Sequence, residues 1–193
     1  MKKFLFIAIA LIFLTATVHA AQPVRIACLP IIIQSSMPDI DTSAEIEMKI
    51  ARAVHIPLNG TLQLAEYIPT EESKQVLVDI WQKLRAENKK AKLADAIRPL
   101  ARELNADIVV CPVLLRYSQY VMYSSWNEMI IDSTARAELI VYDRRSDELV
   151  DKKCTRFYRD GYHPNGTASA LAKVCFDKVI DETKLHHLIR SIK

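Results

Sequence analysis

The chain has 193 residues, with 26 lysines and arginines against 23 aspartates and glutamates and a formal net charge of +3. A balance this close to neutral argues against nucleic-acid binding and against strong attachment to an anionic surface, because both usually need a large basic excess. Only three glycines occur, which argues against a turn-rich all-β sandwich and against a glycine-rich phosphate-binding loop. The length suits one domain with a sizeable core.

Residues 1–20 have the three parts of a secretory signal peptide. Lys2 and Lys3 form a basic start, the apolar run 4–14 follows, and the segment ends at Ala20 with small residues at the cleavage-determining positions. The apolar run is shorter than the ~20 residues of a membrane-spanning helix, so we expect cleavage after Ala20 rather than a retained anchor. No cysteine follows the run where lipid attachment would need one, which disfavours a lipoprotein. We therefore expect an exported protein, periplasmic or extracellular, whose mature chain has a net charge of +1 and no transmembrane segment.

Three elements are predicted in the first part of the mature chain. Residues 24–33 form an apolar, β-branched strand in which Pro30 implies a bend or bulge near the end. Residues 43–54 have helical apolar spacing after a capping-box pattern that begins at Thr42, although an alternating pattern within them leaves a strand open. Residues 61–68 alternate in the way that is typical of a short strand.

Two helical patterns follow. Thr70 can cap the first helix, whose apolar stripe lies within residues 77–84. The charged segment 87–92 joins it to a second helical pattern that stops near Asn105, and Pro99 within this pattern implies a kink or a new start.

The segment 104–117 is the longest apolar run outside the amino terminus. It is too short to span a bilayer, and its many β-branched residues predict a central strand buried on both faces. Pro112 cannot donate a hydrogen bond to a neighbouring strand, so we expect a bulge or break there. The continuation, 118–131, predicts an extended hairpin around a turn at 124–127.

The remaining segments predict two strands and two helical stripes. Residues 133–142 alternate as a returning strand, and 149–158 form a last strand whose basic residues suit an exposed edge. A covering helix follows near residues 171–179, and its spacing is repeated in the tail. We expect this tail to dock on the domain rather than await a partner.

The order of elements predicts an α/β fold, at the border of α+β, with a mixed sheet of about five strands and helices packed against it. The expected organisation is a signal peptide over 1–20, a single α/β domain over 21–183 and a basic amphipathic tail over 184–193.

The four cysteines all lie in the expected mature chain, and in an oxidising compartment they permit up to two disulfides. Cys28 and Cys111 lie in apolar runs, where a buried free thiol behaves as a small hydrophobic side chain. Cys154 on the last strand and Cys175 on the covering helix are the favoured pair for a bridge, provided that their Cα atoms lie within ~7 Å.

Three segments carry a resemblance to a known family. They are the strand 25–30 (RIACLP), the helix-to-strand passage 100–110 (LARELNADIVV), and the hairpin formed by 139–143 (LIVYD) with 148–150 (ELV). In this order they resemble the domain shared by the amino-terminal part of TolB, the curli secretion protein CsgG and the penicillin-binding-protein activator LpoB. The resemblance implies the fold and a cell-envelope setting, and it implies no reaction.

The sequence offers little for catalysis. No nucleophile has a base at a recognisable spacing, and no set of histidines, cysteines and acids has zinc-site spacing. Asp160 and His163, in a loop region, are the residues of the alternative interpretation, a hydrolase or metal-dependent enzyme. We favour a protein that is not an enzyme and expect no cofactor.

Aromatic residues of the predicted hairpin are the candidates for partner binding. Tyr120, Tyr123 and Trp126 could anchor a partner, because tyrosine and tryptophan bury a large area with few rotatable bonds. Alternatively, they pack on their own sheet, where aromatic residues are favoured. The loop 34–41 is a second candidate surface. The sequence therefore favours an exported, non-catalytic protein-binding module of the bacterial envelope, with an envelope protein as partner and no nucleic acid.

Overall fold

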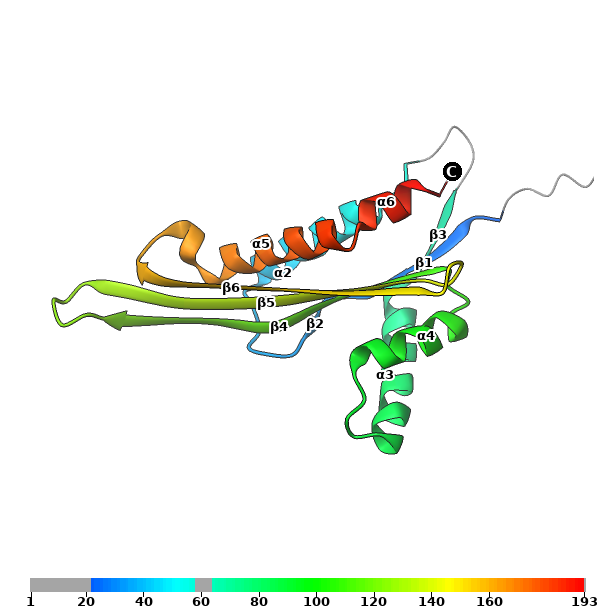
Figure 1. Cartoon of the computed structure of the whole chain (residues 1–193), viewed down its shortest axis with the longest axis horizontal. Coiled ribbons are helices and arrows are strands. Elements are labelled where there is room, and N and C mark those ends of the chain that lie inside the picture. Colours follow the sequence, from blue (N-terminus) through cyan, green and yellow to red (C-terminus); the bar gives the residue numbers. More distant parts are fainter. Residues whose placement is uncertain (1–21, 58–63, 193) are drawn as a thin grey trace, which may run out of the picture.

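A mixed sheet carries the fold, with helices on both of its faces (Figure 1). In the computed structural model, which describes residues 22–57 and 64–192, the sheet order is β3-β1-β4-β5-β6, and β2 pairs with β4. The six strands are β1 (Val24–Cys28), β2 (Ile32–Ile33), β3 (Ala65–Ile68), β4 (Ile108–Tyr123), β5 (Met129–Asp143) and β6 (Glu148–Gly161). The first three run parallel to their neighbours, whereas β4, β5 and β6 form antiparallel pairs. The predicted α/β fold is confirmed, and β6 forms the predicted edge.

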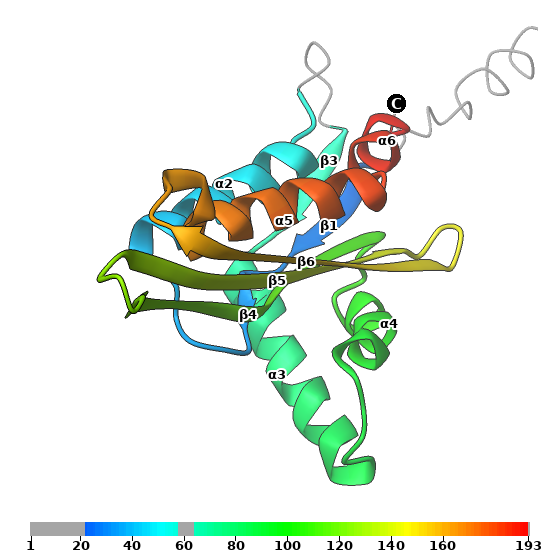
Figure 2. The same ribbon diagram turned by 60° about the vertical axis from the view of Figure 1, so that its left-hand side comes forward.

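Two groups of helices cover the sheet from opposite sides (Figure 2). One face is covered by α2 (Ile40–Val54), α5 (Ala168–Glu182) and α6 (Leu185–Arg190), and a short 3-10 helix, η1 (Pro164–Gly166), precedes α5. The other face is covered by α3 (Thr70–Glu87) and α4 (Leu93–Glu103). Successive side chains of β4 point to opposite faces of the sheet and so contribute to an apolar cluster on each face. Val110 and Leu114 face the first group of helices, and Val109 and Val113 face the second. This explains why the central strand has an uninterrupted apolar sequence.

The carboxyl-terminal tail is packed against the domain. Leu185, Ile189 and Ile192 are buried in the same apolar cluster as α5. The predicted signal peptide and residues 61–63 of the predicted strand 61–68 lie outside the described residues. Within the described ranges, no helix has the length and apolar character that crossing a membrane requires.

The strand β4 passes through Pro112 without the predicted break. On one side of it, β1 pairs with β4 as far as Val110, and β2 resumes the pairing at Val113. Pro112 therefore lies opposite the gap between β1 and β2, where no ladder partner needs its missing N–H group. That gap is the predicted bend around Pro30, which divides the expected first strand in two. The irregularity in β4 lies further on, between Leu114 and Arg116.

Both predicted helix caps were wrong. The helix α2 begins at Ile40, because the Asp39 carboxylate accepts hydrogen bonds from the backbone N–H of Thr42 at 2.7 Å and from its hydroxyl at 2.8 Å. The strand alternative for this segment was also wrong. In α3 the capping position belongs to Pro69, and Thr70 is already helical. Glu71 and Glu72 lie in the first turn of α3, where carboxylates interact favourably with the helix dipole.

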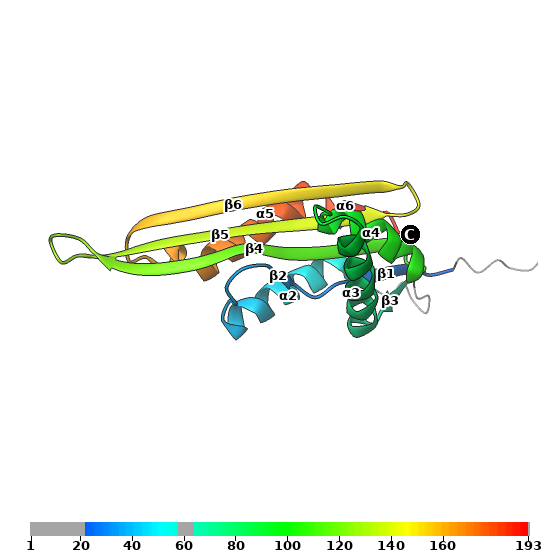
Figure 3. The same cartoon turned by 90° about the horizontal axis from the view of Figure 1, so that it is seen from below.

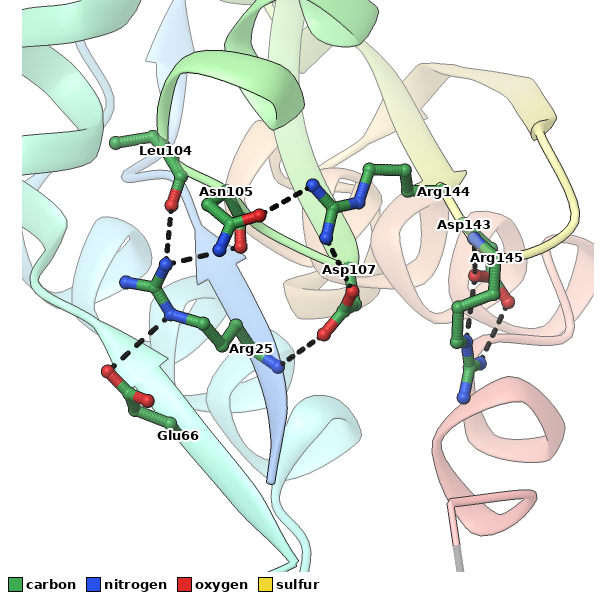
Figure 4. Close-up of polar contacts among 8 residues, drawn as sticks. All are labelled: Arg25, Glu66, Leu104, Asn105, Asp107, Asp143, Arg144 and Arg145. Carbon is green, nitrogen blue, oxygen red and sulfur yellow. Dashed lines mark hydrogen bonds and ion pairs between the residues drawn. The ribbon is translucent and has the colours of Figure 1, made fainter. Parts of the chain in front are cut away.

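A polar network closes the sheet at the start of β4 (Figure 4). The Asp107 carboxylate accepts a hydrogen bond from the backbone N–H of Arg25 at 3.0 Å and another from the Arg144 guanidinium at 2.9 Å. The Arg25 guanidinium donates to the carbonyls of Leu104 and Asn105 at 3.0 and 3.2 Å. Asn105 has φ +49°, the left-handed conformation that terminates α4. We call this network, Arg25, Asn105, Asp107 and Arg144, the anchored end.

The anchored end explains the positions of the family-like segments. The first contributes Arg25, the second contributes Asn105 and Asp107, and Arg144 directly follows the strand of the third. These segments therefore meet in space at one end of the sheet, and their polar residues hold β1, β4 and the β5–β6 turn together.

Candidate protein-binding surface

Beyond the anchored end, β4, β5 and β6 continue as a three-stranded extension (Figure 1). We call residues 116–136 together with 155–161 the ribbon. The helices α3 and α4 lie near the other end of the sheet, so the face of the ribbon on their side carries no helix beyond its root, where Arg116 and Arg136 border α3 (Figure 3). The opposite face is partly covered by α5 and η1. The ribbon therefore has one bare face and a tip that extends past the helices.

The strand register assigns side chains to the bare face. After the irregularity in β4, Tyr117 packs on the cluster beneath α2 and α5, so its neighbour Arg116 faces the other way. Residues directly opposite one another in adjacent strands share a face. The bare face is therefore formed by Arg116, Ser118, Tyr120 and Met122 of β4, Ile130, Asp132, Thr134 and Arg136 of β5, and Thr155, Phe157 and Arg159 of β6.

The predicted aromatic residues are exposed, but they do not form one cluster. Tyr120 lies on the bare face and is 64% exposed, whereas Tyr123, three residues on, is 67% exposed on the opposite face. Trp126, at the tip, is 86% exposed. The alternative in which these side chains pack on their own sheet does not describe the observed arrangement.

The bare face includes an aromatic residue that sequence reasoning missed. Phe157 is 81% exposed and lies two strands away from Tyr120, one row nearer the anchored end. Its signal in the sequence was an aromatic side chain among charged residues on a predicted edge strand. Only the cross-strand register shows that it shares a face with Tyr120.

The turn at the tip is fixed by its own residues. The Ser124 hydroxyl accepts hydrogen bonds from the backbone N–H groups of Trp126 at 3.2 Å and Glu128 at 3.1 Å. Asn127 has φ +61°, a conformation that asparagine tolerates better than most residues. The backbone that carries Trp126 is therefore held in place without help from the tryptophan side chain.

The second predicted surface, 34–41, consists of a loop up to Asp39 and the first residues of α2, and it is tied to the root of the ribbon. The Tyr117 hydroxyl donates a hydrogen bond to the Asp39 carboxylate at 3.0 Å. Hydrogen bonds from Thr42, and then the one from Tyr117, hold the pKa of Asp39 below its usual value. Met37 and Ile40 are strongly exposed on either side of this fixed point. The end of the loop and the start of α2 therefore present apolar side chains from a stabilised backbone.

Asp160 and His163, the residues of the enzyme alternative, have local structural roles. The Asp160 carboxylate accepts from the backbone N–H of Gly161 at 2.7 Å. His163 Nδ1 accepts from the backbone N–H of Asn165 at 3.2 Å, at the start of η1. In the described part of the chain, no group of three or more histidines, cysteines or acids could hold a metal ion. The described contacts do not bring these two side chains together on one site.

The four cysteines are free thiols in this structure. Cys175 lies over β5, where its thiol donates to the carbonyl of Ala135 at 3.6 Å, and Cys154 is the cross-strand partner of Ala137. Burial, followed by interaction with the Cys154 thiol, raises the pKa of Cys175 to about 12. The two side chains are therefore neighbours in one apolar cluster, and their disulfide stays a prediction.

No protein-family model matches the sequence, and no curated protein matches it. Similar solved structures include the hypothetical protein CT253 from Chlamydia trachomatis, with 13% identity, 84% of this chain and 96% of that chain covered, and a TM-score of 0.46. For the lipoprotein GNA1162 from Neisseria meningitidis, the identity is 17%, the coverage 84% and 99%, and the TM-score 0.36. For the LpoB C-terminal domain from Salmonella enterica, the identity is 8%, the coverage is 76% of this chain and 93% of that chain, and the TM-score is 0.34. Lipoproteins and LpoB are thus among the structural neighbours, the likeness to TolB and CsgG stays a prediction, and similarity at this level does not extend to function.

Proposed function

We propose that the protein is an exported, non-catalytic module of the bacterial cell envelope that binds another protein through its ribbon. The observation that carries this proposal is the exposure of Tyr120, Tyr123, Trp126 and Phe157 on a three-stranded scaffold that extends past the helices. Large aromatic side chains provide much of the binding energy at protein interfaces, because they bury a large area at a small cost in rotamer entropy.

The scaffold supports this function because it holds the aromatic residues before any partner arrives. The ladder between β4 and β5 continues to Tyr123 and Met129, and the Ser124 hydrogen bonds fix the turn beyond it. A surface that is ordered in advance loses less conformational entropy on binding. The basic, apolar and small-residue pattern of residues 1–20 supports export.

The enzyme alternative has weaker support. General acid–base chemistry needs groups within hydrogen-bonding reach of one substrate. Asp160 and His163 instead accept hydrogen bonds from nearby backbone N–H groups. We therefore retain protein binding as the proposed function.

The test is site-specific photocrosslinking in the native envelope. A photoreactive phenylalanine derivative replaces Trp126 in one variant, Phe157 in a second and Val174 in a third. Val174 is the matched control, because it is an exposed apolar residue on α5, away from the bare face. We expect a specific crosslinked protein from position 126 or 157 and none from position 174.

A pair of double variants then measures the contribution of each surface. Tyr123→Ser with Trp126→Ser alters the tip and is measured with the photoreactive residue at position 157, whereas Tyr120→Ser with Phe157→Ser alters the bare face and is measured with it at position 126. We expect at least one pair to reduce recovery of the crosslinked protein about tenfold while the unfolding midpoint in urea changes little, since exposed side chains contribute little to stability. Undiminished recovery with both pairs would contradict the proposal.

A further inference from the structure

Two arginines face each other across β4 and β5 where the bare face begins. Arg116 and Arg136 are direct cross-strand partners, and side chains in this relation have Cβ atoms about 4.5–5.5 Å apart. Within the described residues, neither guanidinium has an ion pair or hydrogen bond with a carboxylate. Like charges directly opposite one another destabilise a sheet. This arrangement therefore favours an anion placed between the two side chains.

The arginine pair lines a pocket of about 550 Å³ between the sheet and the α3–α4 connection. This volume lies within the usual range for small-molecule sites, roughly 300–1,000 Å³. The charged lining residues are Arg85, Lys92, Arg116, Arg136, Lys153, Glu138 and Asp151. Five cationic side chains thus face two carboxylates, a surplus of three positive charges in a nearly neutral protein.

The two acids of the pocket are already paired. The Lys153 ammonium group lies 2.8 Å from Glu138 and 3.0 Å from Asp151, so one lysine holds both carboxylates. Among the described residues, neither carboxylate forms an ion pair with Arg116 or Arg136, and the surplus of three positive charges already counts both acids. The remaining positive charge is left for a ligand.

The apolar part of the lining limits what the ligand can be. Trp81, Leu93 and Leu115 contribute to the same pocket, and the Arg85 guanidinium lies 5.6 Å from the centre of the Trp81 ring. Arg85 is oriented by a hydrogen bond to the carbonyl of Lys89 at 2.8 Å. The pocket therefore offers an apolar wall beside a cluster of donors, an arrangement that suits a ligand with an anionic group attached to a less polar body.

We propose that this pocket binds a phosphate-bearing ligand, with Arg116 and Arg136 donating to its phosphate oxygens. Guanidinium groups bind phosphate and carboxylate through paired N–H donors. A carboxylate offers two oxygens and one negative charge, whereas a phosphomonoester or diphosphate offers more oxygens and more charge. The phosphate therefore matches two neighbouring arginines and a surplus of three positive charges better than a carboxylate does. The ligand is either a free small molecule or the headgroup of a phospholipid, and this inference does not depend on the proposed protein partner.

Isothermal titration of the mature protein with sodium pyrophosphate tests the site, in phosphate-free buffer at fixed salt. We expect binding by the unaltered protein and at least tenfold weaker binding by the Arg116→Gln, Arg136→Gln double variant. Arg156→Gln is the matched control, because Arg156 pairs with Ala135 and so faces away from the pocket on the other side of the sheet. We expect it to retain the original affinity.

Vesicle flotation separates the two sources of phosphate. The vesicles contain phosphatidylcholine alone or phosphatidylcholine with phosphatidic acid. Arginine-dependent flotation with phosphatidic acid assigns the site to a lipid headgroup, whereas pyrophosphate binding without flotation assigns it to a soluble ligand. Both results support the proposal.

Three results would overturn it. They are no pyrophosphate binding by the unaltered protein, equal binding by the double variant, and tighter arginine-dependent binding of a hexaglutamate peptide than of pyrophosphate. The last would reassign the pocket to an acidic peptide. The unfolding midpoint of each variant in urea is measured in parallel, and the single Arg136→Gln variant replaces the double variant if the latter does not fold.

Discussion

The anchored end and the ribbon use the same strands in opposite ways. At the anchored end, helices cover both faces, and Asp107 joins Arg25 and Arg144 in a satisfied network. In the ribbon, one face has no helix over it, and Arg116 faces Arg136 without an acidic partner among the described residues. The difference shows that β4 and β5 are buried on both faces at one end, whereas at the other end they are exposed on the bare face.

The change from one role to the other occurs within a few residues of β4. The strand is fully buried from Ile108 to Leu114 and becomes half-exposed or exposed from Leu115 onward. The irregularity between Leu114 and Arg116 marks the same point. The buried part of the strand contributes to the core and the exposed part carries the proposed binding surface, so substitutions in the two parts should have different effects on stability.

The largest expected effect on the free energy of unfolding comes from a disulfide between β6 and α5. Refolding of the urea-unfolded protein with oxidised glutathione should join Cys154 and Cys175 in a disulfide, as the two thiols give up their protons and one electron each and the oxidant leaves as two glutathione thiols. A bridge that closes a loop of this size should raise the free energy of unfolding by about 3 kcal/mol. Peptide mapping without reduction and urea unfolding measure the bridge and its effect.

The Cys28→Ala variant serves as the control for this oxidation. It removes a thiol that lies outside the proposed bridge, so the bridge and its stabilisation should remain. Cys154→Ser should abolish both. Persistence of four free thiols under oxidising conditions would contradict the prediction.

The second prediction compares the stability lost when an aspartate is replaced at the anchored end with the stability lost when one is replaced in the ribbon. Asp107→Ala should lower the free energy of unfolding by about 2 kcal/mol, because it removes hydrogen bonds that involve a charged group. Asp132→Ala, in the ribbon, should cost less than about 0.5 kcal/mol, since its ion pair with Arg159 is long, at 3.9 Å, and the Arg159 side chain is mostly exposed. Urea unfolding of both variants measures the difference. Equal losses would show that the two ends contribute alike to stability.

The third prediction concerns the pH dependence of the stability that Asp39 contributes at the root of the ribbon. Asp39→Ala should lower stability by about 1 kcal/mol at neutral pH through loss of the α2 cap. Because hydrogen bonding lowers the pKa of Asp39 in the folded state, its contribution is present above the ordinary aspartate pKa and is lost as the pH falls through the lowered value. Urea unfolding at a series of pH values should show the full difference between variant and unaltered protein at neutral pH, and this difference should shrink as the pH falls through the lowered pKa of Asp39. A difference that persists in acid would assign the effect to something other than the ionised carboxylate.

The smallest expected effect is the change in the free energy of unfolding when an arginine is replaced by glutamine, and its sign should differ between the ribbon and the anchored end. Arg136→Gln should raise the free energy of unfolding by about 0.3 kcal/mol, because it relieves repulsion with Arg116. Arg144→Gln should lower it, because it breaks the ion pair with Asp107. Unfolding in low-salt buffer gives the largest signal, since salt screens exposed charges. Loss of stability in both variants would show that packing of the Arg136 stem outweighs the repulsion.

Features that depend on local pattern were predictable from the sequence. The β-branched run around Val109 predicted the central strand, the alternation near Leu139 predicted its neighbour, and basic residues such as Lys152 predicted the edge strand. Tyr120 and Tyr123 could also have been assigned to opposite faces, because their spacing is odd.

Features that depend on distant segments were not predictable. Asp39 takes the α2 cap with support from Tyr117, 78 residues away in the sequence. Pro112 is tolerated because another segment breaks near Pro30. The meeting of Arg116 with Arg136 depends on the irregularity after Leu114, and a shift of one residue would place either arginine on the other face.

Because β2 has only two residues, it pairs with only a short part of β4 along one side of that strand. Within the described residues, β4 has no strand neighbour on that side after Leu114, so its ribbon half is an open edge. Such edges invite pairing between chains and aggregation, and natural proteins discourage this with bulges and charged side chains. The irregularity at Leu115 and the positive charge of Arg116 stand where the open edge begins. The same arginine that equips the pocket for an anion therefore also discourages two copies from joining their sheets into a continuous one.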